Sequence, residues 1–544
     1  MSSTTSFEPA TANGHAAPEI AQPRARRPEH AQLLRAVNDD ATPSGLSSGR
    51  STPVPADAPP SVHATSSARK QVRAQQKQRL FPTIEYAARV SHFDPQSDYH
   101  DFRGFFVLFW VGLAIMVFSN MVRHYKETGY PLSIRQWNTF TANIWEMGLS
   151  DLIMVASTAL SLPLHKLYDS SKDGLRWSKN GMLVQSIYQG IWLIFWTLWP
   201  FVRGWTWTAQ VFFILHYLVL FMKMHSYAFY NGHLSETRRR LQELDHPENA
   251  SMDAARKYPS AQTHLNQLTP EEEKEHADLT NDESLAHLRD DLAHELISPL
   301  GNTSYPKNLT LYNYVDYLFC PTLCYELEYP RTQRIRKMEL LYKTLAVFGC
   351  IFLLTFVTEQ YVMPALDIAV EQLELPGTVG DRTLIVLETI SRLLFPFVVI
   401  FLLVFLVIFE YALGAFAEMT CFADRHFYSD WWNSCDWLEF SREWNIPVHR
   451  FLRRHVYSAS RPRFSRSTAT IITFLISAAA HELVMGCITK KLRGYGAFAM
   501  MLQIPIVAVQ RSKPVRGRTL LNNVLFWFSM VLGLAMMCAL YVLV

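Results

Sequence analysis

Nine stretches of apolar residues alternate with polar and charged segments along this chain. They cover approximately residues 102–122, 145–165, 181–201, 206–230, 341–362, 388–413, 468–488, 495–510 and 519–542. An α-helix needs about 20 apolar residues to cross the hydrocarbon core of a bilayer, and most of these stretches are long enough. The eighth is short and contains Pro505, which predicts a kinked or re-entrant helix. The pattern therefore predicts an all-α polytopic membrane protein with about nine transmembrane helices.

The polar segments divide the chain. Residues 1–80 are rich in Ala, Pro, Ser, Thr and Gln, so they cannot bury enough apolar surface to fold and are predicted to form a disordered cytosolic tail. They contain no apolar core of a cleavable signal peptide. Residues 81–544 form the predicted membrane-embedded domain, which includes a strongly charged cytosolic loop at 235–308.

Basic residues predict the orientation of the spans. Basic residues lie next to the membrane spans in three segments: the tail, the loop after the second span and the 235–308 loop. The positive-inside rule therefore places these segments in the cytosol. The loop after the fifth span is acidic, as suits the opposite side. Lys490, Lys491 and Arg493 fall on that opposite side against the rule. This disagreement predicts that the seventh and eighth helices form a non-standard pair.

Composition narrows the class of protein. Hydrophobic residues make up 49% of the 544 residues and charged residues only 18%, whereas soluble domains have about a quarter charged residues. The net charge of +3 carries little information, and we expect no nucleic-acid partner. Among seven cysteines only Cys320 and Cys324 are close together, and no second pair completes a metal site or a disulfide framework.

An ionisable residue in the middle of an apolar span is the first candidate for function. His481 lies within the seventh stretch, where a charged or polar group is costly unless it has partners or a role. The alternative is a histidine that only bonds a neighbouring helix. Ser477, one turn earlier on the same helical face, either orients the imidazole or packs between helices. Glu482 points about 100° away by helical geometry and is a poor direct partner.

Two aromatic segments lie between the sixth and seventh spans. The first is Phe427–Asn433 (FYSDWWN) and the second is Trp444–His449 (WNIPVH). Tryptophan and tyrosine concentrate at membrane interfaces, so interfacial anchoring is one reading. It explains less well why Asp430, Asn433 and Asn445 stand between the aromatic residues.

The first segment resembles the FYxDWWN signature of the sterol and diacylglycerol acyltransferases within the membrane-bound O-acyltransferase superfamily, and the second is similar to another segment of that group. An intramembrane histidine followed by glutamate, one span later, matches the catalytic position of the family. The segments 102–106, 223–232 and 481–485 are similar to the sterol branch, of fungal type. The resemblance covers residues from about 102 to the carboxyl terminus.

The resemblance implies which residues form the site. His481 is expected to be the general base and Asn433 the partner of the acyl carbonyl or oxyanion, within a chamber enclosed by the helices. The residues expected to contact substrate are Tyr428, Asp430, Trp431, Trp432, Asn445, His449, Ser477 and His225. His225, at the end of the fourth span, either lines a substrate path or sits at the boundary. Arg450, Arg453 and Arg454 either meet the phosphates of coenzyme A or anchor the topology.

The chemistry needs only a positioned base. A thioester is already activated, so a histidine that removes the proton of an attacking alcohol is enough, typically contributing 10²–10⁴-fold. Burial in a chamber of low dielectric keeps the imidazole neutral and limits hydrolysis of the thioester.

We therefore expect an acyl-CoA-dependent sterol O-acyltransferase of the endoplasmic reticulum membrane, which forms homo-oligomers. It should need no cofactor, since acyl-CoA is a co-substrate. The nearest alternative acceptor is diacylglycerol. A different class, a transporter or lipid receptor, lacks support because no inverted repeat with broken helices is visible. No nucleophile elbow, phosphate-binding loop or histidine box with metal spacing occurs either.

Overall fold

The computed structural model describes residues 82–94 (without 83 and 85), 97, 103–131, 141–171, 174–245, 289, 291–299, 301–515 and 517–544. The whole predicted tail, residues 1–80, and most of the predicted 235–308 loop lie outside the described residues. The structure is all-α, as the sequence predicts. Within the described part of the chain no sheet forms, and three isolated bridges join Arg89 to Asp424, Ile297 to Ser304 and Arg331 to Phe422.

Helices form over the predicted apolar stretches, and also over residues 311–319 and 363–374, which lie outside them. The longer helices of the described chain are α3 (Arg103–Thr128), α5 (Ile144–Thr158), α6 (Ser161–Ser170), α7 (Met182–Val202), α8 (Trp207–Asp245), α13 (Leu311–Phe319), α14 (Lys337–Val357), α15 (Met363–Glu374), α16 (Val379–Phe405), α21 (Arg466–Thr489), α22 (Tyr495–Gln510) and α23 (Thr519–Leu543).

Shorter elements connect them. These are the π-helical turns η1 (Trp177–Gly181), η2 (Thr358–Val362), η3 (Leu406–Ala412) and η5 (Leu452–Tyr457), the 3₁₀ turn η4 (Trp431–Asn433), and the short helices α17 (Leu413–Met419), α18 (Trp437–Glu443), α19 (Ile446–Phe451) and α20 (Ser458–Ser460).

Seven helical segments of the described chain are long and apolar enough to cross a membrane. They are Gly104–Thr128, Ile144–Ser170, Thr208–Glu243, Lys337–Glu374, Val379–Met419, Arg466–Thr489 and Thr519–Leu543. The third and eighth predicted spans are helical too, as α7 and α22, but neither is among these seven, and α22 has only 16 residues. The polytopic architecture is confirmed, whereas the count of nine spans is not.

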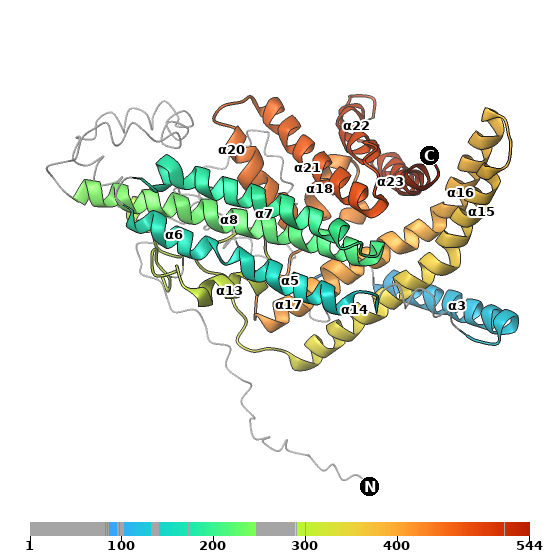
Figure 1. The fold of residues 1–544 in the computed structure, drawn as a ribbon, viewed down its shortest axis with the longest axis horizontal. Helices are drawn as coiled ribbons and strands as arrows, with labels where there is room; N and C mark the ends of the chain where they lie inside the picture. Colours follow the sequence, from blue (N-terminus) through green and yellow to red (C-terminus); the bar gives the residue numbers. More distant parts are fainter. Residues whose placement is uncertain are drawn as a thin grey trace, which may run out of the picture. The chain divides into compact units, whose positions relative to one another are not determined.

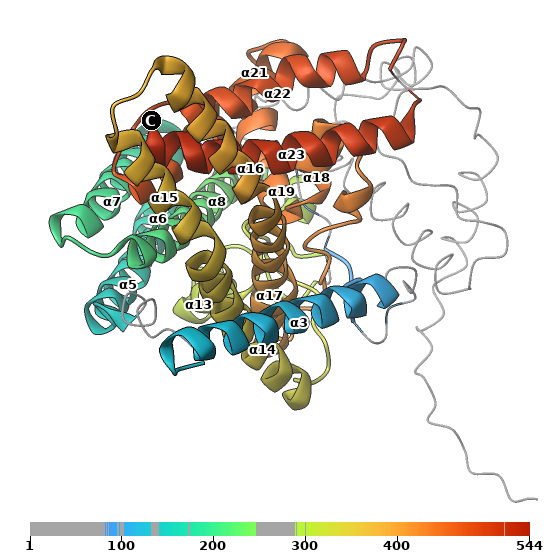
Figure 2. The ribbon, with the colours of Figure 1, turned by 90° about the vertical axis from the view of Figure 1, so that its right-hand side faces the viewer.

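Two groups of helices make up the bundle. The long helix α8 packs against α5, α6, α7 and α21, and α16 packs against α14, α15 and α23 (Figure 1). Helices α21 and α22 lie side by side as a hairpin, which is seen again after a quarter turn (Figure 2). Helix α8 continues to Asp245, ten residues beyond the start of the predicted charged loop at residue 235.

Local sequence explains where the helices near the site begin. Ser465 caps α21 by accepting a hydrogen bond from the Thr468 amide at 3.2 Å. At α16, Thr378 and Asp381 cap each other reciprocally, with the Asp381 carboxylate 2.8 Å from the Thr378 amide. These side chains satisfy amides that the first helical turn leaves without partners.

A segment before the first helix is tied to residues that follow it by about 335 positions in sequence. We call residues 82–94 the strap. Arg89 donates to the buried Asp424 carboxylate through Nε at 2.8 Å and Nη2 at 2.6 Å. Its backbone amide donates to Ala423, and its carbonyl accepts from the Arg425 amide, each at 2.9 Å. The strap therefore lies against the residues that directly precede the FYSDWWN segment.

Candidate active site

Helix α21 presents His481 with one ring nitrogen already committed. The imidazole Nδ1 lies 2.8 Å from the backbone carbonyl oxygen of Ser477, one turn earlier. A carbonyl only accepts hydrogen bonds, so Nδ1 carries the hydrogen, and Nε2 of the neutral ring keeps its lone pair. His481 is exposed, which leaves Nε2 accessible. The tautomer fixed by this bond is the one that a general base requires.

The Ser477 contact differs in kind from the predicted one. The sequence left two roles open for the Ser477 side chain, orienting the imidazole or packing between helices. In the structure the backbone carbonyl of Ser477 orients the imidazole. Any residue at position 477 supplies that carbonyl, so the orientation of the ring depends on the helix rather than on the hydroxyl.

Glu482, the residue after His481, has a structural role. Its Oε1 accepts from the amides of Arg493 at 3.2 Å and Gly494 at 2.7 Å, and its Oε2 accepts from the Ala497 amide at 3.1 Å. The Tyr541 hydroxyl of α23 donates to the same Oε2 at 2.8 Å. A carboxylate at these amides stabilises the start of α22. Glu482 thus joins α21, α22 and α23, as expected for a residue that points away from His481.

The other flank of α21 packs against α8 and η5. Leu483, Val484 and Cys487 belong to an apolar cluster with the buried α8 residues Leu220 and Met224. Next to this cluster, His225 of α8 and His455 of η5 lie with ring centroids 5.2 Å apart.

Both histidines of this pair are held by polar neighbours. His225 Nδ1 is 3.0 Å from Gln189 Oε1, and its ring stacks on Phe229. His455 Nε2 is 2.8 Å from Ser226 Oγ. Burial lowers the pKa of His455, and the charge of Arg454 lowers it further, so the ring is neutral near pH 7.

The expected burial of His481 is wrong for the chain alone. The residue is exposed, so protein side chains do not enclose the imidazole.

The FYSDWWN segment is anchored mainly through its aromatic residues. Trp431 is 1% exposed and packs edge-on against Phe401, Trp444 and other rings. The Trp432 carbonyl accepts from Asn523 Nδ2 at 3.0 Å and from Trp527 Nε1 at 3.1 Å, both on α23. This burial favours a packing role for Trp431 over the predicted role as a substrate contact.

Tyr428 is buried as well, and its hydroxyl donates to the Glu410 carboxylate at 2.9 Å. The polar members of the segment are more accessible. Asn433, at the end of η4, is exposed and has only backbone groups engaged in hydrogen bonds within the described chain. Asp430 accepts from the Ser429 hydroxyl at 3.0 Å. It also faces Glu443 of α18: burial raises the pKa of Glu443 to about 7, and the Asp430 charge contributes to the shift.

Backbone hydrogen bonds join the two aromatic segments. The Ile446 amide donates to the Phe427 carbonyl at 3.0 Å, and the Ser429 amide donates to Glu443 at 2.9 Å. Asn445 caps α19, since its Oδ1 accepts from the Val448 amide at 3.1 Å. The cap uses the amide oxygen and leaves the Nδ2 hydrogens without a partner among the described residues.

Arginines surround His449 on α19. Burial lowers the pKa of His449 to about 4, and the charges of Arg442, Arg453 and Arg450 lower it further. Arg454 is buried and forms an ion pair with Glu326 at 3.0 Å. Its role is therefore in internal packing rather than in binding a phosphate. Arg453 is exposed. The ring of His449 is therefore neutral near pH 7, in a positive local field.

Sequence reasoning missed several polar residues. Glu410 and Lys343 are buried within apolar spans and form an ion pair at 2.8 Å. The argument that selected His481, an ionisable group at membrane depth, applies equally to both of them. His455 had no such signal, because it stands in the arginine-rich segment before α21.

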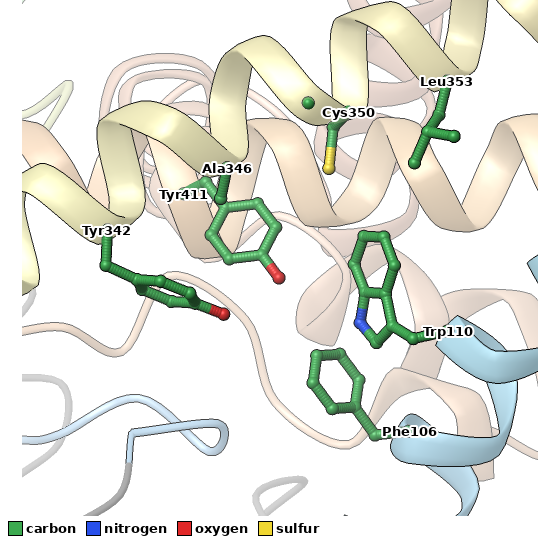
Figure 3. A pocket seen from close by; sticks show the side chains of 8 residues that line it. Phe106, Trp110, Tyr342, Ala346, Cys350, Leu353 and Tyr411 are labelled. Atoms are coloured by element: carbon green, nitrogen blue, oxygen red, sulfur yellow. The ribbon is translucent and has the colours of Figure 1, made fainter. Parts of the chain in front are cut away.

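The structure also contains an apolar cavity that does not adjoin His481. It has a volume of about 300 Å³ and lies between α3, α14 and η3 (Figure 3). Its aromatic walls are Phe106, Trp110, Tyr342 and Tyr411. A smaller cavity of about 270 Å³ next to it shares Trp110 and Leu353. Since its lining residues come from neither α21 nor the 427–449 region, we do not assign the reaction to this space.

Residues 191–543 match the model of the membrane-bound O-acyltransferase family. The chain is 39% identical to the probable sterol O-acyltransferase 2 of Schizosaccharomyces pombe, over 85% of this chain and 91% of that protein. It is 34% identical to the sterol O-acyltransferase 2 of Candida albicans, over 85% of this chain and 78% of that protein. The diacylglycerol O-acyltransferase 1 of Dictyostelium discoideum is 36% identical, but over only 45% of this chain and 39% of that protein.

Proposed function

Because this chain belongs to the membrane-bound O-acyltransferase family, we propose that it transfers a fatty acyl group from acyl-CoA to the 3-hydroxyl of a sterol, with His481 as the general base. The hydrogen bond from His481 Nδ1 to the Ser477 carbonyl is the observation that carries the assignment of the base. It leaves Nε2 as a proton acceptor on an accessible face of a membrane helix.

The reaction proceeds in two steps. His481 Nε2 takes the proton of the sterol hydroxyl while its oxygen attacks the thioester carbonyl, which forms a tetrahedral oxyanion. The intermediate collapses, the carbon–sulfur bond breaks, and the imidazolium returns the proton to the coenzyme A thiolate. The products are a sterol ester and free coenzyme A, and no covalent enzyme intermediate is needed.

Two amide side chains are the proposed hydrogen-bond donors to substrate. Asn433 is exposed at the end of η4, and Asn445 has its Nδ2 group unengaged because the cap uses only Oδ1. An uncharged donor stabilises a developing oxyanion without adding a second charge to an apolar site. Asn433 therefore remains the proposed carbonyl partner, and Asn445 a proposed substrate contact.

Apolar substrates would complete the enclosure of the exposed base. An acyl chain and a sterol ring system placed against α21 exclude water from the ring, which favours transfer over thioester hydrolysis. We propose a location in the membrane of the endoplasmic reticulum. No cofactor beyond the co-substrate acyl-CoA is proposed, and self-association of the chain stays a prediction.

The choice of sterol as the acceptor rests on the names of the related proteins. The proteins that match this chain over most of their length are named sterol O-acyltransferases, whereas the diacylglycerol enzyme matches over less than half of the chain. The test incubates purified protein with labelled oleoyl-CoA and either ergosterol or diacylglycerol. Sterol ester as the main product supports the proposal, and triacylglycerol as the main product overturns the choice of acceptor. Absence of coenzyme A release with either alcohol would favour a transporter or receptor.

A further inference from the structure

A buried ion pair contacts Tyr428 of the FYSDWWN segment and includes none of the proposed catalytic residues. Glu410 stands in η3, the π-helical turn that links α16 to α17, and Lys343 stands in α14. Both are almost fully buried, with side chains 4% exposed. Burying two charges costs free energy that their mutual attraction does not reliably return, so such a pair is weak evidence for stability alone. Single π-helical turns inside α-helices frequently occur at functional sites.

The two carboxylate oxygens of Glu410 have separate partners. Oε1 accepts from Lys343 Nζ at 2.8 Å. Oε2 accepts from the Tyr428 hydroxyl at 2.9 Å and from the Ser91 hydroxyl of the strap. The Ser91 and Tyr428 hydroxyls are themselves 2.9 Å apart. Lys343 therefore fixes the carboxylate, and the carboxylate fixes the strap and the FYSDWWN segment.

The backbone makes room for this arrangement. Nζ of Lys343 also donates to the Glu410 carbonyl at 3.2 Å, one of the carbonyls in the π-helical turn. A Cβ at Gly414 would come within 2.8 Å of the Lys343 side chain, so glycine leaves the space that the lysine occupies. The lysine is thus held against η3 rather than free to leave it.

Tyr428 is the point at which this network reaches the site. The FYSDWWN segment is held at one end by the Tyr428 hydroxyl and at the other by the Trp432 carbonyl, which α23 binds. Asn433 follows directly after the second anchor, with an exposed side chain. A displacement of about 1 Å in a group that contacts the reacting atoms can lower a rate about 100-fold.

We propose that Glu410 is a positioning residue, which holds Tyr428 and thereby sets the place of Asn433 for acyl transfer, while Lys343 neutralises the buried charge of its carboxylate. This inference rests on the proposed function, because it needs Asn433 to contact the substrate. Glu410 itself touches neither substrate.

The test compares two double variants that both lack the buried charges. Lys343→Met/Glu410→Gln removes the pair but keeps an amide oxygen that accepts from Tyr428 and Ser91. Lys343→Met/Glu410→Leu removes the pair and the acceptor together. Neutral replacement of a buried ion pair is often tolerated, so both variants should fold. We expect the first to keep kcat within about threefold of the natural protein, and the second to lose roughly 10- to 100-fold in kcat per folded protein.

The Tyr428→Phe variant is a second, independent test of the same hydrogen bond. It should lower kcat about as much as Lys343→Met/Glu410→Leu, and combining the two should add nothing further, since both remove the same hydrogen bond. Hydrogen exchange of residues 427–433 gives a readout that does not depend on activity. The amides of this segment should exchange faster in Lys343→Met/Glu410→Leu than in Lys343→Met/Glu410→Gln.

The outcomes separate the two proposals. If the natural protein forms no sterol ester, the proposed function fails, and the exchange comparison still tests the anchor. If the natural protein is active and both double variants have equal kcat per folded protein, Glu410 is not a positioning residue. Equal exchange of residues 427–433 in both variants would overturn the inference on structural grounds.

Discussion

Helix α21 and the 427–449 region carry the two most distinctive motifs of this chain, and they are built in opposite ways. On α21, His481 is exposed and makes a single hydrogen bond to its own helix. In the 427–449 region, Tyr428 and Trp431 are buried, Asn445 caps a helix, and backbone bonds join the two segments. The longer motif is therefore largely a scaffold, and the chemistry falls to its few accessible polar groups and to the exposed histidine of α21.

The largest expected effect is on α21. His481→Ala removes the proposed base and should lower kcat by about 10²–10⁴-fold, while the melting temperature in detergent changes little, because the ring is exposed. Coenzyme A release with oleoyl-CoA and sterol measures the rate. Near-normal esterification by this variant would end the proposed mechanism.

Ser477→Ala is the matched control. It keeps the backbone carbonyl that binds Nδ1, so the rate should stay within about twofold of the natural protein. A large loss would show that the hydroxyl, and not the helix carbonyl, orients the ring.

The next effect should be on stability, in the other region. Trp431→Ala empties a site in the aromatic cluster and should cost about 3–5 kcal/mol, with less folded protein recovered. Trp431→Phe should recover part of that loss. A normal melting temperature together with a raised KM for either substrate would instead make Trp431 a wall of the site.

Variants of Asn445 test whether this residue only caps α19 or also contacts the substrate. Asn445→Ala loses the cap and should lower the free energy of unfolding by about 1 kcal/mol. Asn445→Asp keeps the cap but has no N–H to donate, so stability should be retained and kcat should fall about tenfold or more. Full activity of Asn445→Asp would assign Asn445 to the scaffold alone.

The smallest effect concerns Glu443. Its pKa is raised to about 7 from 4.5, so the folded protein binds this proton more tightly than the unfolded chain does. Stability from this group is present at pH 4.5 and is lost as the pH rises toward 7. Glu443→Gln should therefore raise the melting temperature more at pH 8 than at pH 5. An equal change of the melting temperature at pH 5 and pH 8 would contradict the prediction.

The apolar pattern located most of the long helices, but it missed α13 and α15 and did not give the number of spans. Each predicted stretch is helical, yet α7 and α22 are not among the seven spanning segments. The extent of α8 to Asp245 was also missed, because its last turns are polar and are held by tertiary contacts. One of these joins Arg239 to the carbonyls that end α6.

The site was predictable only in part, and for a physical reason. The motif located Tyr428 and Trp431, but residue type cannot tell an aromatic wall from an aromatic core, since both need large apolar surfaces. The role of the Ser477 carbonyl could not be predicted, because every residue has a backbone carbonyl and residue type does not show which one accepts a side-chain hydrogen bond. The Glu410–Lys343 pair was visible as charge in apolar spans, but its partners in the strap and in the FYSDWWN segment depend on tertiary folding.

The Arg89–Asp424 bond has a consequence for how the protein is made. Its two residues are 335 positions apart in sequence. At about 5–20 residues per second, a ribosome needs roughly tens of seconds to synthesise the second partner after the first. During that interval Arg89 lacks its Asp424 partner, while five of the seven spanning segments are already synthesised. The bond between the strap and the residues before the FYSDWWN segment can therefore form only after these segments exist, when α21, α22 and α23 are still to be synthesised.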